Sequence, residues 1–439
     1  MYAERRRQVL DKISEGAAIF CATSEAIRNH DVHHDFRQDS DLYYLTGFEE
    51  PSTVLLLLAT ADKNPHSVLF LRERDIEREI WDGVRLGLDA ALETLEVDEV
   101  YPIESLSEKL PTLLVGAKKV YYDLARHDRE ENDQSVLNAV IAAKRNRRRD
   151  SIVPVGIEDA SPFIHELRLF KSQAEIDTMR RAAQLTAIGH RRAMEVTAAG
   201  VREYQLEAAM EYEWRVRGSA RNDYPSIVGS GPNSCVLHYR AGHRAMNDGE
   251  LVLVDAGCEK DYYASDVTRT WPVSGSFTKE QRQIYSLVLK AQKACIDTCR
   301  VGETVNSIHN VAVKVLVEGL IELGLLTGDV ESLISDEAYK RFYMHQTSHW
   351  IGMDVHDVGK YTTADGAPRP FEEGMVLTVE PGIYISPSDT EVPASYRGIG
   401  IRIEDDILVT NDEPDNLSID VPKELDEIEK IVGSRRLEL

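Results

Sequence analysis

The feature that most constrains the fold of this chain is a unit of one strand and one acid that occurs twice. Residues 249–257 read Gly-Glu-Leu-Val-Leu-Val-Asp-Ala-Gly, and residues 374–382 read Gly-Met-Val-Leu-Thr-Val-Glu-Pro-Gly. Each copy has a glycine, an apolar strand, an acid at the same position, and a turn that ends in glycine. A repeat of this kind indicates a duplicated half-domain.

Each copy precedes a second strand that carries an acid of its own. Asp266 lies in Ser-Asp-Val-Thr-Arg-Thr, and Glu404 lies in Gly-Ile-Arg-Ile-Glu-Asp-Asp-Ile. With Lys260-Asp261 as a two-residue turn, Asp255 faces Asp266 across the first hairpin. Like charges that face each other on neighbouring strands destabilise a sheet unless a cation compensates them. We therefore expect the acids of both copies to surround bound cations: Asp255, Asp266, Glu380 and Glu404.

A cluster of histidines lies just before the second copy. His345 and His349 are four residues apart, which puts both side chains on one side of the chain, and His356 follows. At least one of them should reach the cations. Four carboxylates balance the charge of two divalent ions, and oxygen-rich ligation with a single nitrogen favours Mn(II) over metals that prefer thiolates. Two neighbouring ions can activate a shared water, so the sequence predicts metal-assisted hydrolysis.

The length of 439 residues predicts two or three domains. Short apolar runs at 17–22, 54–59, 67–71 and 119–124 alternate with helical stretches, which is typical of an α/β domain. Pro154, Gly156 and Pro162 mark a boundary, so we expect an N-terminal α/β domain at 1–165 and a second domain at 166–439.

The second domain combines long helices with the duplicated strands. Ser172 and Glu175 form a predicted capping box before a helix that covers 176–193, and Thr278 and Gln281 form another before a helix that ends near 300. A further helix is expected at 305–325. The predicted class of this domain is α+β, with helices that cover a mostly antiparallel sheet.

Charge and composition exclude several partners and locations. Basic residues number 51 and acidic residues 75, so the net charge of −24 argues against nucleic acid and anionic membranes as partners. The basic run at 144–150 has no interleaved aromatic residues and is interpreted as a linker or subunit contact. Apolar runs are far shorter than a membrane span, and no signal peptide is apparent at 1–13. The five scattered cysteines suit a reducing compartment, so we expect a cytoplasmic protein.

Several motifs together carry a resemblance to a known family. In chain order they are Phe36 to Pro51, Glu79-Ile-Trp81, Ser226-Ile-Val-Gly-Ser-Gly-Pro-Asn233, Leu237-His238-Tyr239, Asp255-Ala-Gly257, Asp266-Val-Thr-Arg-Thr270, Ser348-His349-Trp350, Val355-His356-Asp357-Val-Gly359, Glu380-Pro-Gly382 and Gly400-Ile-Arg-Ile-Glu404. The ordered set resembles the bacterial aminopeptidase P group (Xaa-Pro aminopeptidases) of the pita-bread metallopeptidases, over nearly the whole chain. Gln346-Thr347 departs from some relatives, which have glycine and an apolar residue there.

The resemblance implies a pita-bread catalytic domain that removes the N-terminal residue from peptides with proline in the second position. It implies a dinuclear manganese site, with these ligands: Asp255, Asp266, His349, Glu380 and Glu404. It also implies active-site roles for residues that are not ligands: His238, His345, His356 and Arg402. Glu380 would in addition shuttle a proton. The family's assembly is a homotetramer in which Trp81 approaches a neighbouring active site.

Two other functions stay open from the sequence. A prolidase of the same fold would accept only dipeptides, because it captures the free carboxylate of the substrate. A pita-bread protein that binds partners without catalysis would have lost metal ligands, whereas all five ligand positions are filled in this chain.

Overall fold

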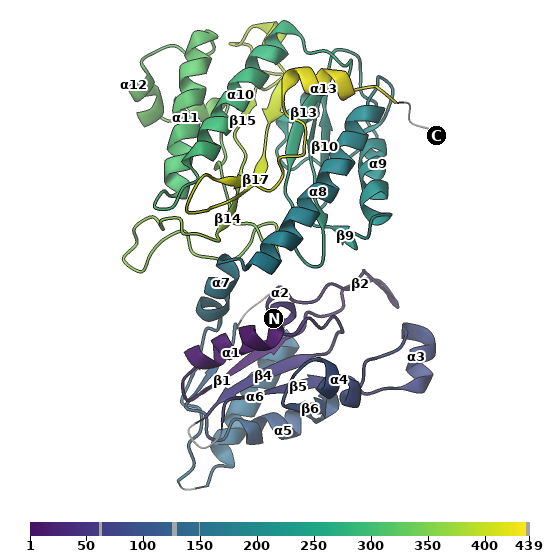
Figure 1. The fold of residues 1–439 in the computed structure, drawn as a ribbon, viewed down its shortest axis with the longest axis vertical. Helices are drawn as coiled ribbons and strands as arrows, with labels where there is room; N and C mark the ends of the chain where they lie inside the picture. Colours follow the sequence, from purple (N-terminus) through teal and green to yellow (C-terminus); the bar gives the residue numbers. More distant parts are fainter. Residues whose placement is uncertain (61–63, 125–129, 149, 436–439) are drawn as a thin grey trace. The chain divides into compact units, whose positions relative to one another are not determined.

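The apolar runs of the first part of the chain form one six-stranded sheet, in the order β6-β5-β4-β1-β7-β8 (Figure 1). Its strands are β1 (Gly16–Cys21), β4 (Val54–Ala59), β5 (His66–Leu71), β6 (Glu99–Pro102), β7 (Lys119–Tyr121) and β8 (Ile157–Glu158). The central strands β1 and β4 are antiparallel and buried at every position, as uninterrupted apolar runs predict. β7 pairs in parallel with β1.

The computed structural model describes residues 1–60, 64–124, 130–148 and 150–435, which divide into two compact units, Met1–Leu167 and Arg168–Leu439. The helices of the first unit are α1 (Tyr2–Lys12), α2 (Ser40–Thr46), α3 (Ile76–Asp82), α4 (Leu88–Thr94), α5 (Leu106–Leu113) and α6 (Glu130–Arg145). Helix α7 (Ser161–Leu169) leads from the first unit into the second. The predicted α/β character of the N-terminal part is confirmed.

The duplicated segments form the centre of the second unit, and every strand pair there is antiparallel. The first copy contributes β9 (Arg221–Asn222), β10 (Ile227–Ser230), β11 (Leu251–Asp255), β12 (Cys258–Glu259) and β13 (Thr268–Pro272). The second copy contributes β14 (Val376–Val379), β15 (Gly382–Tyr384), β16 (Gly400–Arg402), β17 (Asp405–Leu408) and β18 (Asp415–Asn416). The strands are arranged as β10-β11-β13, β12-β9, β14-β17-β18 and β15-β16.

Long helices flank these strands on two sides (Figure 1). They are α8 (Gln173–Val196), α9 (Glu203–Arg215), α10 (Lys279–Thr298) and α11 (Val305–Glu322), with the shorter α12 (Val330–Ser335) and α13 (Leu425–Ile431). Helix α8 packs against α9, and α10 packs against α11. Both predicted capping boxes are present, at Ser172 and at Thr278. The α+β prediction for this unit is confirmed.

The register of the first hairpin differs from the predicted one. Asp255 pairs with Thr268, and Lys260 forms a bridge with Tyr263. The turn residues are therefore Asp261 and Tyr262, and both have the positive φ angles, 50° and 69°, that a tight hairpin turn of this type requires. The predicted pairing of Asp255 with Asp266 is wrong, because the turn lies one residue later and the register moves with it.

Three further segments can be described in the structure. Cys295 and Cys299 are completely buried in the core. The segment around His30 forms a small exposed hairpin of β2 (Ile27–Asn29) and β3 (Val32–His33). The basic run is exposed at its described positions, and Arg149 lies outside the described residues. Within the described ranges, no helix is long and apolar enough to cross a bilayer.

Candidate metal centre

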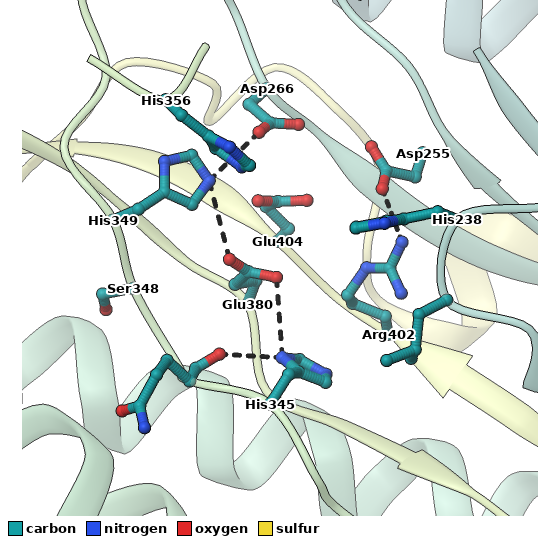
Figure 2. Close-up of a pocket in the computed structure, with 12 residues that line it drawn as sticks. His238, Asp255, Asp266, His345, Ser348, His349, His356, Glu380, Arg402 and Glu404 are labelled. Carbon is teal, nitrogen blue, oxygen red and sulfur yellow. Dashed lines mark hydrogen bonds and ion pairs between the residues drawn. The ribbon is translucent and has the colours of Figure 1, made fainter. Parts of the chain in front are cut away.

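Side chains from both copies of the repeat line one pocket of about 220 Å³ in the second unit (Figure 2). Its lining includes every ligand and active-site residue expected from the sequence: His238, Asp255, Asp266, His345, His349, His356, Glu380, Arg402 and Glu404. Leu237, Gln346 and Ser348 complete it. The structure thus brings together residues that are up to 166 positions apart in the sequence, from His238 to Glu404.

Each acid lies where a strand ends or is interrupted. Asp255 is the last residue of β11, and Asp266 lies just before β13. In the second copy, both strands of the hairpin are interrupted at these acids. Val379 pairs with Asp405 on one side of the interruption and Gly382 pairs with Arg402 on the other, so the pairing register does not change. This shared register places Glu380 opposite Glu404. Interrupted strands free these side chains from the alternation of a sheet, so that all four reach the same pocket.

Three donor groups are close enough to share one cation. Asp266, His349 and Glu404 each offer a ligand atom, and these atoms all lie within 4.8 Å of one another. The Nε2 atom of His349 lies 3.3 Å from Oδ2 of Asp266 and 3.6 Å from Oε1 of Glu380. Carboxylate oxygens with one imidazole nitrogen suit Mn(II), Zn(II) or a similar divalent ion. The residues present therefore fit the metal that the sequence predicts.

The carboxylates of this pocket are difficult to ionise together. Burial raises the pKa of Asp255 and Glu380, the latter to about 7, and raises the pKa of Glu404 well above its usual range. Burial acts on Asp266 as well, but its hydrogen bond with His349 and the charge of His349 outweigh it and lower the pKa of Asp266. A carboxylate cluster whose pKa values rise through burial and mutual repulsion is stabilised in its ionised form by bound cations.

Arg402 connects the two copies of the repeat. Its guanidinium pairs with Asp255 of the first copy, and its Nη1 donates to the Tyr384 hydroxyl over 2.8 Å. The same hydroxyl lies 2.9 Å from Nε2 of His345. Arg402 is buried, and its Nε donates to Oγ1 of Thr268 over 3.0 Å. These contacts fix the Arg402 guanidinium and the His345 side chain in one wall of the pocket.

Two of the histidines are neutral in this environment. Burial, with the charge of Arg402, lowers the pKa of His345 to about 3, and burial with the charge of His349 lowers the pKa of His356. The ring of His356 lies against the ring of His349, with 4.5 Å between their centroids (Figure 2). A neutral imidazole in this position can donate one N–H hydrogen bond towards a reacting oxygen.

Two residues that form hydrogen bonds with the acids were not predicted from the sequence, Tyr224 and Thr268. The hydroxyl of Tyr224 lies 2.6 Å from Oδ1 of Asp255 and 2.5 Å from Oδ1 of Asp266, and Thr268 donates to Oε2 of Glu404 over 2.5 Å. Tyr224 lies outside the repeated sequence segments 249–257 and 374–382, so no pattern in the sequence links it to the acids. Thr268 and Glu404 belong to different copies of the repeat, so the register of one hairpin does not predict their contact.

Comparison with known proteins identifies the family. Residues 177–411 match the metallopeptidase family M24, and residues 2–121 match the N-terminal domain of aminopeptidase P. The chain belongs to metallopeptidase family M24.

Relatives of this M24 chain match it from end to end. It is 45% identical to the Xaa-Pro aminopeptidase of Escherichia coli, over 99% of this chain and 98% of the relative. It is 42% identical to the Xaa-Pro aminopeptidase of Haemophilus influenzae, over 98% and 97% of the two chains. The solved structure of the aminopeptidase PepP from Pseudomonas aeruginosa superposes with a TM-score of 0.95 at 46% identity, over 98% and 97% of the chains.

These similarities confirm the predicted family, fold class and enzyme class. The second unit of this M24 peptidase has the pita-bread fold, as aminopeptidase P has. The chain is a metallopeptidase of the Xaa-Pro aminopeptidase group, and the donor cluster around His349 is its candidate metal centre.

Proposed function

We propose that this metallopeptidase releases the N-terminal residue from peptides that have proline in the second position, and that it works with two divalent ions, Mn(II) in the cell. The proposed ligands come from both copies of the repeat and from the histidine segment: Asp255, Asp266, His349, Glu380 and Glu404. The observation that carries the proposal is their convergence with His345, His356 and Arg402 on one pocket. When bound, the ions supply an activated water and polarise the scissile carbonyl group.

Glu380 is the proposed proton carrier. Its Oε1 atom lies 3.6 Å from Nε2 of His349, so the carboxylate lies among the proposed ligands, where it can accept a proton and return it. Its Oε2 atom lies 3.8 Å from Nδ1 of His345, so Glu380 faces the side of the pocket that His345 lines. In the proposed reaction Glu380 takes a proton from the attacking water and delivers it to the proline nitrogen, which becomes the new amino terminus.

His356 is proposed to stabilise the carbonyl oxygen as negative charge develops on it. The lowered pKa of His356 keeps the ring neutral, so one ring N–H is available as a donor without protonation of the ring. His356 makes no contribution to the ligand set in this proposal. It contributes to the transition state rather than to the binding of the ions.

Proline selectivity is proposed to come from the wall that holds Arg402. Tyr384 is buried and joins Arg402 to His345 by hydrogen bonds, and His238 lines the same pocket. A rigid wall of this kind favours the fixed ring of proline over flexible residues. The free amine of the substrate would be held by the negative charge of the carboxylates.

The assembly is proposed to be a homotetramer in which Trp81 lies near a neighbouring active site. Helix α3 has no buried residue, and its side chain Trp81 is 84% exposed. Ile76, Ile80 and Val84 on the same segment are each more than 75% exposed. An apolar surface of this kind suits a subunit contact better than solvent. We also propose domain limits of 1–165 and 166–439, a cytoplasmic location, and no nucleic acid or membrane partner.

The cleavage of a tripeptide tests this proposal. The protein loaded with Mn(II) should release arginine from Arg-Pro-Pro and should leave Arg-Ala-Ala uncleaved. A prolidase would hydrolyse the dipeptide Arg-Pro and leave Arg-Pro-Pro intact. A binding protein without catalysis would cleave none of the three. Either of the last two results would contradict the proposed activity.

A further inference from the structure

Glu203 is a completely buried acid that takes no part in the proposed reaction. It is the first residue of α9, and its carboxylate accepts hydrogen bonds from a single segment of the chain. At Oε1 the donors are the Ser230 backbone N–H (2.8 Å), the Ser230 hydroxyl (2.7 Å) and the Asn233 amide (3.0 Å). At Oε2 they are the Tyr239 hydroxyl (2.9 Å) and the Gly242 backbone N–H (3.3 Å). Both carboxylate oxygens are thus used.

The donors lie on both sides of His238 in the sequence. Ser230 and Asn233 precede it, and Tyr239 and Gly242 follow it. Residues 236–244 belong to no helix or strand, so no regular structure holds the backbone of His238 in place. The hydrogen bonds to Glu203 therefore close this segment into a loop around one carboxylate, with the His238 side chain in the lining of the metal pocket.

The packing around Glu203 shows that the loop is built closely against it. A Cβ atom at Gly242 would lie 2.7 Å from the Tyr239 hydroxyl and 3.2 Å from Oε2 of Glu203, so a side chain at this position would displace the hydrogen bonds. Arg244 donates to the Ser230 hydroxyl over 2.7 Å and pairs with Glu250. The Ser230 hydroxyl thus accepts a hydrogen bond from Arg244 and donates its own proton to Glu203.

We propose that Glu203 is a positioning residue that holds His238 in the pocket and that it thereby supports the preference for proline. This inference rests on the role that the proposed function gives to His238. The proposal also gives a role to the motif Ser226 to Asn233. The Ser230 and Asn233 side chains of this motif donate hydrogen bonds to Glu203.

Glu203→Gln replaces one of the two acceptor oxygens by an NH₂ group while it keeps the size of the side chain. Whichever way the carboxamide is oriented, its NH₂ group faces a backbone N–H, that of Ser230 or that of Gly242, and a backbone N–H cannot become an acceptor. The loop must therefore move. Glu213→Gln is the matched control, because Glu213 lies on the same helix α9 and pairs with Arg217 on the protein surface, away from the pocket.

The test is a double-mutant cycle with Mn(II)-loaded, full-length protein, in which kcat/KM for Arg-Pro-Pro is measured together with metal content. We expect Glu203→Gln to keep its metal and to lower kcat/KM about tenfold, with Glu213→Gln unchanged. In the His238→Ala background, Glu203→Gln should lower kcat/KM by less than about twofold, because the residue that it positions is absent.

Several results would overturn the inference. If the losses of kcat/KM in Glu203→Gln and His238→Ala multiply in the double variant, Glu203 does not act through His238. If Glu203→Gln loses metal, Glu203 acts on the whole site. If His238→Ala has full activity, the role of His238 in the proposed function fails as well. Tyr239→Phe removes a single donor and replaces Glu203→Gln in the cycle if the latter does not fold. Its smaller loss of kcat/KM should vanish in the same way in the His238→Ala background, and a loss that persists there would contradict the proposal.

Discussion

The two copies of the repeat place their acids at matching positions, yet they compensate the charge of those acids differently. In the first copy, Asp255 pairs with Arg402 and Asp266 lies beside His349. In the second copy, burial raises the pKa of Glu380 to about 7 and that of Glu404 well above its usual range. In the first copy burial also raises the pKa of Asp255, and only Asp266 has a lowered pKa. The closest ion pairs between protein cations and these acids thus lie in the first copy, and the second copy depends more on bound ions.

The largest effect should follow the removal of metal. Chelation should abolish activity, and Mn(II) should restore it, because the bound ions supply the activated water and compensate the charge of the acids of the second copy. The measurement is the rate of Arg-Pro-Pro cleavage before and after dialysis against a chelator, with metal content determined in parallel. Full activity in a metal-free preparation would contradict both the proposed mechanism and the contrast between the copies.

His356→Ala should reduce turnover and leave the acids of both copies with their ions. A donor near the developing oxyanion is worth about 3 kcal/mol, so kcat should fall about a hundredfold. The measurements are kcat, metal content and a thermal unfolding curve, and metal content should equal that of the unaltered protein. Loss of one ion would make His356 a ligand, and an unchanged kcat would make it a structural residue only.

Substitution of one acid from each copy, studied in the metal-free protein, tests whether the charges of the two copies are compensated differently. Asp255→Asn leaves the buried Arg402 without its carboxylate, which should lower the free energy of unfolding by about 3 kcal/mol. Glu404→Gln replaces a carboxyl group whose raised pKa already keeps it protonated, so the same free energy should change by less than about 1 kcal/mol. Urea unfolding of both variants in chelator is the measurement. Equal losses would show that the copies are compensated alike.

The smallest expected effect is the contribution of Glu380 to the pH dependence of stability in the metal-free protein. Its pKa is about 7 in the folded protein against an ordinary value of 4.5, so the unfolded chain loses this proton first as the pH rises. The metal-free protein should therefore lose roughly 2 to 3 kcal/mol of stability between about pH 4.5 and 7, relative to Glu380→Gln. The difference between their urea unfolding curves isolates this residue. A difference that does not change over this range would contradict the raised pKa.

Local patterns in the sequence predicted much of the fold. Strand β4 has the predicted bounds, and helices α8 and α10 begin at the predicted capping boxes, because these features depend on residues close together in the chain. The register of the first hairpin could not be predicted in this way. Its turn contains Tyr262 at a positive φ, which a tyrosine rarely adopts, and tertiary packing decides such a position.

The candidate site was visible in the sequence where its residues repeat or cluster. The duplication pointed to the acids, the spacing at 345–356 pointed to the histidine cluster, and the resemblance to a family pointed to His238 and Arg402. Tyr224 and Thr268 reach those acids across 31 and 136 residues of sequence, so their contacts depend on the folded structure alone. Glu203 was missed for the same reason, since its donors come together only when the loop around His238 has formed.

The number of divalent ions per chain tests the central claim most directly, which is that acids from both copies jointly hold two ions. Metal analysis after loading with Mn(II) and removal of free ions should give two ions per chain in the unaltered protein. Glu404→Ala should give fewer, because the Glu404 carboxylate is a proposed ligand and lies within 4.8 Å of donor atoms of Asp266 and His349. Two ions retained in Glu404→Ala at unchanged affinity, or a single ion in the unaltered protein, would contradict the account.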